Sequence, residues 1–347
     1  MNGECCDEEI CRGNHLSEKN DNYIKEILNE KAEEEDEVHV EHVNPDIKEL
    51  DLTRNRLKKI QNLDFLKELQ FLGLRWNLLS KIENLTHLTT LVHLELYDNQ
   101  IQKIEGLENL VNLEILDLSF NRVEKIEGLQ NLVKLRELYL VHNKLTKIEG
   151  LENLVNLEYL ELGDNSIAKI ENLETNTKIE RLFLGANEIS VIENLDNLCN
   201  LQVLSIPACA IPKITGLNNL KKLRELYINS NGISVIEGLD GLDNLEILDL
   251  NYNRISVVEN IEHLTKLKEF WARSNKIENF RDIENLSKHP LLHGIYFQFN
   301  PIFEQSNYHG RILKILPQIK RLDGDFKRDM IRYNYIENDN KNEELQI

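Results

Sequence analysis

An asparagine recurs along this sequence at a constant step, and this period constrains the fold more than any other feature. The positions are Asn55, Asn77, Asn99, Asn121, Asn143, Asn165, Asn187, Asn231, Asn253 and Asn275. Cys209 fills the one double step, and Asn300 follows after a slightly longer one. We call these the ladder positions. A fixed period of this length predicts stacked units, not the two or three globular domains that 347 residues would otherwise suggest.

Each ladder position lies inside a fixed pattern of apolar residues, LxxLxLxxNxIxxI. In one repeat the positions are Leu135, Leu138, Leu140, Asn143, Leu145 and Ile148. Because side chains alternate along a strand, the two leucines of LxL point inward and the residue between them points outward. This is the pattern of a leucine-rich repeat. We therefore predict an α/β solenoid, with a parallel β-sheet on its concave face and short helical or 3₁₀ turns on its convex face.

Two positions of the repeat predict how the backbone turns. The asparagine amide both donates and accepts hydrogen bonds, so it can satisfy backbone groups of its own loop and of the neighbouring loop. Cys209 is a weak donor, and we expect a locally weaker contact there. Seven residues after the ladder position, ten repeats carry glycine or asparagine, which tolerate a positive φ. They are Asn62, Asn84, Gly106, Gly128, Gly150, Asn172, Asn194, Gly216, Gly238 and Asn260.

The two ends of the chain differ from the repeats. Residues 1–37 and 337–347 are acidic and are predicted to be disordered. About twelve repeats are expected over residues 38–302, and an edge strand caps the first of them. The alternating valines of that strand are Val38, Val40 and Val43. Residues 303–336 are expected to form a C-terminal cap. Its predicted helix rests on the spacing of Ile312, Ile315 and Leu316.

The outward residue of each strand lies four positions before the ladder position, and these residues form the first concave row. The row is Asp51, Gly73, Glu95, Asp117, Tyr139, Glu161, Phe183, Ser205, Tyr227, Asp249, Trp271 and Tyr296. A second concave row, two positions earlier, includes Glu137, Tyr159, Arg181, Glu225, Glu269 and Gly294. Aromatic side chains on such a face are typical binding anchors, and acids among them favour a basic partner surface. The alternative is that the rings stack across strands and stabilise the sheet without a ligand.

The first concave row changes in character along the array. Its early positions are mainly acids and its later positions mainly aromatics, which predicts one partner with its apolar anchor toward the C-terminal end. Trp271 is the residue that we expect to contribute most, since one of only two tryptophans occupies an outward position. The other, Trp76, immediately precedes Asn77 and is predicted to pack in its loop.

Composition and charge exclude several classes of function. The formal net charge is −19, which disfavours binding to nucleic acid and to anionic membranes. No signal peptide or membrane-spanning apolar stretch is visible, and the five cysteines show no disulfide framework. Three cysteines and a histidine near the start could bind a metal ion together, or they could be incidental residues of a disordered segment. We prefer the second interpretation. The group is Cys5, Cys6, Cys11 and His15. No catalytic, zinc or phosphate-binding pattern is found, so we predict no catalysis, metal or cofactor.

Four stretches carry a resemblance to a known family. They are LRELYLVHNKLTKIEGLENL (135–154), KLKEFWARSNKIENF (266–280), GIYFQFNP (294–301) and ILPQIKRLDGDFKRD (315–329). Together they resemble the protein phosphatase 1 regulatory subunit 7 family, solenoids of 22-residue repeats, over about residues 45–330. The repeat is shared by many proteins. The block Glu269–Trp271, the longer last loop and the cap are more specific, whereas Cys209 and the acidic N-terminus depart from the family's pattern.

The resemblance implies a regulator that binds the catalytic subunit of protein phosphatase 1 with its concave face, in the nucleus and the cytoplasm. A further regulatory protein can join such a complex. The implied contact positions are Asp117, Tyr139, Glu161, Phe183, Glu269, Trp271 and Tyr296, and Asp249 occupies the corresponding position of its own repeat. The residues alone leave an alternative open, a leucine-rich-repeat adaptor for a cytoskeletal, ciliary or spliceosomal protein.

Overall fold

One continuous β-sheet runs through the structure, a computed structural model that describes residues 44–328. Its fourteen strands follow one another in sequence order, and only the last pair is antiparallel. The strands are β1 (Glu49–Asp51), β2 (Phe71–Gly73), β3 (His93–Glu95), β4 (Ile115–Asp117), β5 (Glu137–Tyr139), β6 (Tyr159–Glu161), β7 (Arg181–Phe183), β8 (Val203–Ser205), β9 (Glu225–Tyr227), β10 (Ile247–Asp249), β11 (Glu269–Trp271), β12 (Gly294–Tyr296), β13 (Arg321–Leu322) and β14 (Asp325–Phe326).

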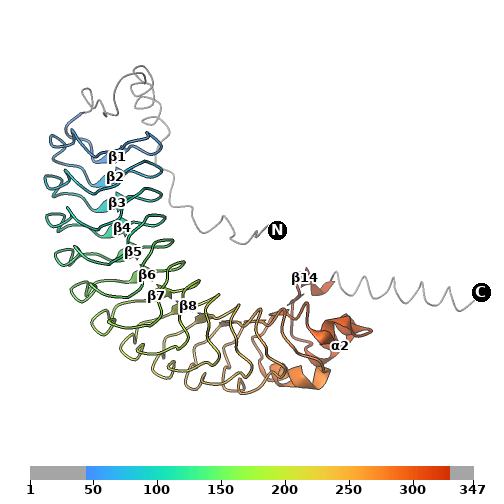
Figure 1. Ribbon diagram of the computed structural model, residues 1–347. Coiled ribbons are helices and arrows are strands. Elements are labelled where there is room, and N and C mark those ends of the chain that lie inside the picture. The colour runs from blue at the N-terminus through green and yellow to red at the C-terminus, as the bar shows by residue number, and fades with distance from the viewer. Residues whose placement is uncertain (1–43, 329–347) are drawn as a thin grey trace, which may run out of the picture.

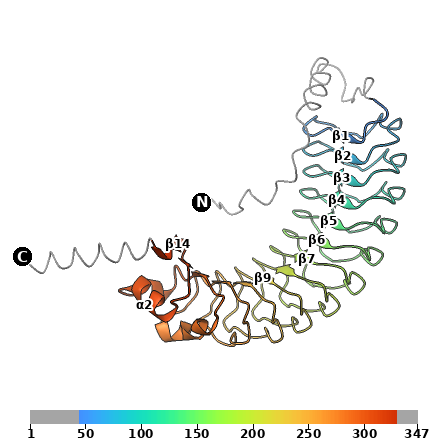
Figure 2. The ribbon, with the colours of Figure 1, turned by 180° about the vertical axis from the view of Figure 1, so that it is seen from behind.

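The repeats follow a curved arc whose inner side carries the sheet (Figures 1 and 2). From β1 to β11 each strand pairs with the next at a constant offset of one repeat, as in Leu138 with Leu160. Equivalent side chains of neighbouring repeats therefore lie directly beside each other. The middle residue of each of these strands is buried, and so is the second leucine of LxL. The predicted leucine-rich-repeat solenoid is confirmed.

The leucine and isoleucine positions of the repeat form one continuous apolar core. Burial of a side chain of this size contributes roughly 1.5–3 kcal/mol, and much of the buried area lies between neighbouring repeats. An isolated repeat would leave both of its faces exposed to water. The array is therefore stable only as a stack, which is the general property of solenoids.

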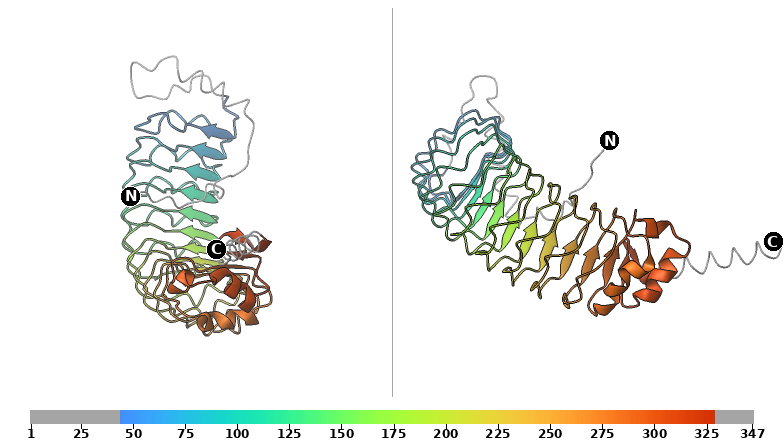
Figure 3. Two further views of the ribbon diagram at one scale, coloured as in Figure 1. Left: turned by 90° about the vertical axis from the view of Figure 1, so that its right-hand side faces the viewer. Right: turned by 60° about the horizontal axis from the view of Figure 1, so that its bottom comes forward.

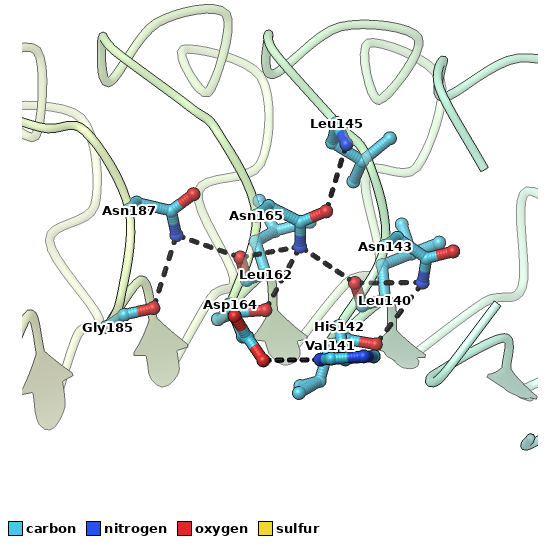
Figure 4. A network of polar contacts seen from close by, with 11 residues as sticks. Leu140, Val141, His142, Asn143, Leu145, Leu162, Asp164, Asn165, Gly185 and Asn187 are labelled. Carbon is cyan, nitrogen blue, oxygen red and sulfur yellow. Dashed lines mark hydrogen bonds and ion pairs between the residues drawn. The ribbon is translucent and has the colours of Figure 1, made fainter. Parts of the chain in front are cut away.

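The ladder asparagines connect neighbouring repeats through the backbone (Figure 4). Asn165 donates through Nδ2 to the carbonyls of Leu140, Leu162 and Gly163, each at 3.0 Å. Its Oδ1 accepts the amide of Leu145 at 3.0 Å. One side chain thus satisfies four backbone groups in two repeats, which confirms the predicted role of this position.

The convex side consists of short turns. All ten glycine and asparagine residues at the predicted position have positive φ, between 58° and 72°. The turns that follow carry i→i+3 hydrogen bonds, such as Leu110 N–H to the Leu107 carbonyl at 2.9 Å. These are 3₁₀-type bonds, but the segments are too short to form helices. The predicted 3₁₀ turns of the convex face are therefore confirmed. The short repeat leaves room only for isolated turns outside the strand.

Helices occur where the spacing lengthens near the C-terminus (Figure 3). They are η1 (Phe280–Lys288), η2 (Pro301–Glu304) and α2 (Tyr308–Ile315). The predicted capping helix is confirmed as α2, which buries Tyr308 and Ile312. Asp323 ties the cap to β12, since it accepts the amides of Phe297 and Gln298 and the hydroxyl of Tyr308. The predicted N-terminal edge strand, the acidic segments 1–37 and 337–347 and the thiol group near the start lie outside the described residues.

Candidate protein-binding face

Two aromatic clusters lie on the concave face. In the central aromatic cluster, Tyr159 on β6 lies between Tyr139 on β5 and Phe183 on β7, with ring centroids 4.7 and 5.1 Å apart. In the C-terminal aromatic cluster, Trp271 on β11 contacts Tyr227 at 6.2 Å and Tyr296 at 5.8 Å. All six rings are partly exposed. Rigid rings of this kind supply large contact areas at a small cost in side-chain entropy.

Every Tyr or Trp of these clusters except Tyr296 donates a hydrogen bond to an acid two residues away on its own strand. Tyr139 donates to Glu137 at 2.7 Å and Tyr159 donates to Glu161 at 2.9 Å. In the other cluster, Tyr227 donates to Glu225 at 2.9 Å and Trp271 donates to Glu269 at 3.2 Å. Because residues two apart share one face of a strand, the acids hold the rings in fixed orientations.

Burial raises the pKa of several concave carboxyl groups. It raises the pKa of Asp117 and of Glu161, and hydrogen bonds from Ser119 and Tyr159 respectively oppose the shift. Burial raises the pKa of Asp249 to about 6, against the opposing hydrogen bond from the Asn251 amide. Desolvated carboxylates of this kind gain most from a cation that a partner brings.

Asp249 is buried by rings from the two neighbouring strands. It pairs in register with Tyr227 on one side and Trp271 on the other. Strands two positions apart in a sheet are roughly 10 Å apart. The centroids of these two rings are only 6.2 Å apart, so the rings lean toward each other over the aspartate. Only 6% of Asp249 remains exposed.

The eight predicted contact residues all lie on the concave face, but two of them are not open surface. Six are partly exposed: Asp117, Tyr139, Glu161, Phe183, Trp271 and Tyr296. Asp249 and Glu269 are buried, which corrects the interpretation of both as exposed contacts. Glu269 is surrounded by His293, Trp271 and Arg321, the last contributed by the cap. Its role in the structure is to position Trp271.

Several residues of the face were missed in the sequence. Tyr159 and Tyr227 complete the two clusters but were not among the predicted contacts. Both belong to the concave rows, and their position beside aromatic residues of nearby strands is the signal that identifies them. Arg321 could not be identified in this way, because it lies outside the repeats. Its pairing with Gly294 of β12 depends on how the cap folds back. Trp76 lies in the loop that follows β2, where its ring packs against Tyr97 and Arg54 as predicted, and 39% of the residue remains exposed.

Strands β7–β9, between the two clusters, carry a shallow open hollow. Two acids and two arginines flank two uncharged residues in its lining: Glu180, Arg181, Gln202, Val203, Arg224 and Glu225. Within residues 44–328, no group of three or more His, Cys, Asp or Glu side chains is arranged to hold a metal ion. No helix in that range has the length and apolarity needed to cross a membrane. The face thus offers anchors and charges for a macromolecular surface.

Comparisons with known proteins agree with the repeat pattern and the fold. The family described as "Leucine Rich repeats (2 copies)" matches residues 89–131, 133–175, 221–256 and 243–288. An internalin (inlF) from Listeria monocytogenes is 26% identical, with 81% of this chain and 88% of that chain covered and a TM-score of 0.64. No curated protein matches the chain.

Two further solved structures share the fold at lower identity. A leucine-rich-repeat protein of Leptospira interrogans is 22% identical, with 80% of this chain and 83% of that chain covered and a TM-score of 0.58. A chain from the octameric complex of Latrophilin 3, Unc5D and FLRT2, in which FLRT2 carries the leucine-rich repeats, is 23% identical, with 71% and 81% covered and a TM-score of 0.60. The constant period, the asparagine ladder and the parallel sheet agree with these matches, and the chain is a leucine-rich-repeat protein.

Proposed function

We propose that this protein is a non-catalytic regulatory scaffold that binds the catalytic subunit of protein phosphatase 1 through its concave face. The main observation in support of the proposal is the pair of aromatic clusters, whose rings are hydrogen-bonded to acids on the same strands. Six of the eight predicted contact positions are partly exposed on this face. The resemblance also supports a location in the nucleus and the cytoplasm, and a complex that admits a further regulatory protein.

The chemistry of the face describes the partner surface that would fit it. Apolar groups would pack against Phe183, Trp271 and Tyr296, which are held by neighbouring rings and buried acids. Basic groups would approach Asp117 and Glu161, whose partial desolvation is unfavourable while the face is empty. A partner with lysine or arginine beside an apolar patch meets both demands.

Titration of the purified phosphatase catalytic subunit against the full chain tests the proposal. Trp271→Ala is expected to weaken the affinity by about 2 kcal/mol, roughly 30-fold, as hot-spot truncations do. Phe183→Ala is expected to weaken it similarly from the other cluster. Val155→Ala is the matched control, because Val155 is an exposed apolar residue outside the concave rows. Glu269 is unsuitable as a test residue, since its loss would also disturb the cap.

Unchanged affinity in both aromatic variants would contradict the assigned face. The alternative function is an adaptor for a different protein, which the same combination of rings and acids also favours. Pull-down from the source cell with wild-type chain and the Trp271→Ala variant separates the two. Capture of another protein that depends on Trp271, without the phosphatase subunit, would replace the proposed function by the adaptor.

A further inference from the structure

A second set of aromatic residues lies outside the concave rows, at the edge where the strands end. The rings of Trp76, Tyr97, Phe120 and His142 stack from repeat to repeat, with centroids 5.6, 4.9 and 4.7 Å apart. The guanidinium of Arg54 lies 4.4 Å from the Trp76 ring centroid and extends the stack by one repeat. We call these five residues the rim stack. His142 is next to Asp164 at the far end (Figure 4).

The core does not require aromatic residues at these positions. The residue before each ladder position has positive φ, for example 52° at Trp76 and 56° at Phe120. Bulky side chains rarely adopt this conformation, and other repeats place Asp164 or Ser230 there. Tyr97 lies one position earlier, and Asp98 has the positive φ in its repeat. Trp76 and Phe120 also remain 39% and 38% exposed. Large rings held at unfavourable positions and left open to solvent indicate a contact surface.

The rim stack is accompanied by cations. Arg54, Arg56, Arg122 and Lys144 are exposed along the same edge. No carboxylate of residues 44–328 forms an ion pair with any of these four. Asp98 is the exposed acid between them, and Asp164 is engaged by His142. The edge is therefore locally basic and aromatic, although the whole chain carries a net charge of −19.

We propose that the N-terminal segment of this chain, residues 1–43, binds along the rim stack. The segment contains 14 acidic and four basic residues, and it joins the array immediately before β1. Its carboxylates complement the rim cations. Its apolar residues provide groups for the ring faces: Tyr23, Ile24, Ile27 and Leu28.

Geometry and electrostatics favour this edge over the concave face. The rim stack spans five repeats, roughly 20–25 Å at the spacing of neighbouring strands, and about eight extended residues cover that distance. Attachment at β1 keeps the segment at a high effective concentration. The neighbouring concave face presents Asp51, Asp117 and Glu161, which repel an acidic segment. The rim surface is separate from the face of the proposed function, so each can fail without the other.

Fluorescence of Trp76 in the full chain tests the proposal. Trp271→Phe leaves Trp76 as the one tryptophan, and the neutral quencher acrylamide then reports its exposure. In this background we neutralise the acidic run by Glu33→Gln, Glu34→Gln, Glu35→Gln, Asp36→Asn and Glu37→Gln. The quenching constant is expected to rise about two-fold or more. Glu343→Gln with Glu344→Gln, in the C-terminal acidic tail, is the matched control and is expected to change nothing.

A binding experiment in trans completes the test. A synthetic peptide of residues 1–43 is titrated into the neutralised chain while Trp76 fluorescence is followed. Saturable binding that weakens at least ten-fold between 50 and 500 mM salt is expected, roughly as screening of several ion pairs requires. Phe120→Asn suits the positive φ and is expected to weaken this binding while the chain keeps its thermal unfolding midpoint.

Three results would overturn the proposal. Equal quenching in the neutralised and parent chains would show that the segment does not cover Trp76. Absence of peptide binding would exclude the assigned partner chemistry. Protection of Trp76 that grows with protein concentration would assign the rim stack to a second copy of the chain.

Discussion

Glu269 on β11 forms an ion pair with Arg321 on β13, across the strand that lies between them. The intervening strand contributes Gly294, where an added Cβ atom would overlap Oε2 of Glu269. The same carboxylate lies 3.1 Å from His293 Nδ1 and accepts the indole N–H of Trp271 at 3.2 Å. The C-terminal cap therefore fixes the residue that we expect to be the main anchor of the concave face.

Gly294→Ala should break this arrangement. The added methyl group occupies the space of the Glu269 carboxylate, which has to leave Arg321 and the Trp271 indole. A buried charged group that loses its partners costs on the order of 2 kcal/mol, so we expect the free energy of unfolding to fall by about that amount. Urea unfolding followed by tryptophan fluorescence measures the change.

The control for this substitution is Gly163→Ala, whose Cβ would meet only the Gly185 carbonyl oxygen, at 3.3 Å. In a Glu269→Ala background, Gly294→Ala should cost little, because the carboxylate is already absent. An equal cost of Gly294→Ala in both backgrounds would show that the clash with Glu269 is not the cause.

Asp249 should make the stability of the array depend on pH. Burial raises its pKa to about 6, so between pH 4 and 6 the folded chain holds a proton that the unfolded chain releases. Stability attributable to this group therefore falls as the pH rises through that window. Asp249→Asn keeps an acceptor for the Asn251 amide and removes the charge. We expect it to be more stable than wild type at pH 7.5, by up to about 3 kcal/mol, and the difference to vanish near pH 4.

Asp51→Asn is the matched control for the pH experiment. Asp51 accepts the amide of Thr53 at 2.9 Å, the same contact that Asp249 makes with Asn251, but Asp51 is exposed whereas Asp249 is buried. Urea midpoints of both variants at the two pH values provide the comparison. A gain for Asp249→Asn that is the same at pH 4 and pH 7.5 would contradict the assignment.

Cys209→Asn should stabilise the array. The Cys209 thiol donates one long hydrogen bond, 3.6 Å to the Leu184 carbonyl, where the amide of Asn165 in its own repeat donates to several carbonyls. Restoring the amide is expected to raise the free energy of unfolding by about 1 kcal/mol. The reverse change, Asn187→Cys, should lower it by a similar amount in the same urea series. If both changes lower the stability, the surrounding backbone has adapted to the thiol.

Gly150 should tolerate asparagine better than alanine. It has a φ of +69°, and a Cβ there would press against the Ile126 carbonyl oxygen. Asn172, at the equivalent position, donates through Nδ2 to the Ile148 carbonyl at 2.7 Å. We expect Gly150→Ala to cost about 1–2 kcal/mol and Gly150→Asn to recover about half through the new hydrogen bond. Thermal unfolding of the two variants checks this prediction. A lower unfolding midpoint for Gly150→Asn than for Gly150→Ala would contradict it.

The sequence and the structure agree where a residue acts within the period of the repeat. Leu138, Asn165 and Gly150 have roles that follow from their places in the repeat, and each was predictable. The concave rows were predictable for the same reason, since alternation along a strand places Tyr139 and Trp271 on one face. Tyr159 and Tyr227 needed one more step, the contact between rings on neighbouring strands.

The sequence by itself determined the solenoid, its parallel sheet, the residues that face inward and those that line the concave face. These follow from short-range periodicity and are the same in every repeat. The tertiary structure decided which concave residues are accessible, because burial depends on side chains from other strands. Rings from β9 and β11 cover Asp249, and the cap reaches back to hold Glu269. The same is true of the rim stack, whose rings come from four repeats and meet only when the repeats are stacked.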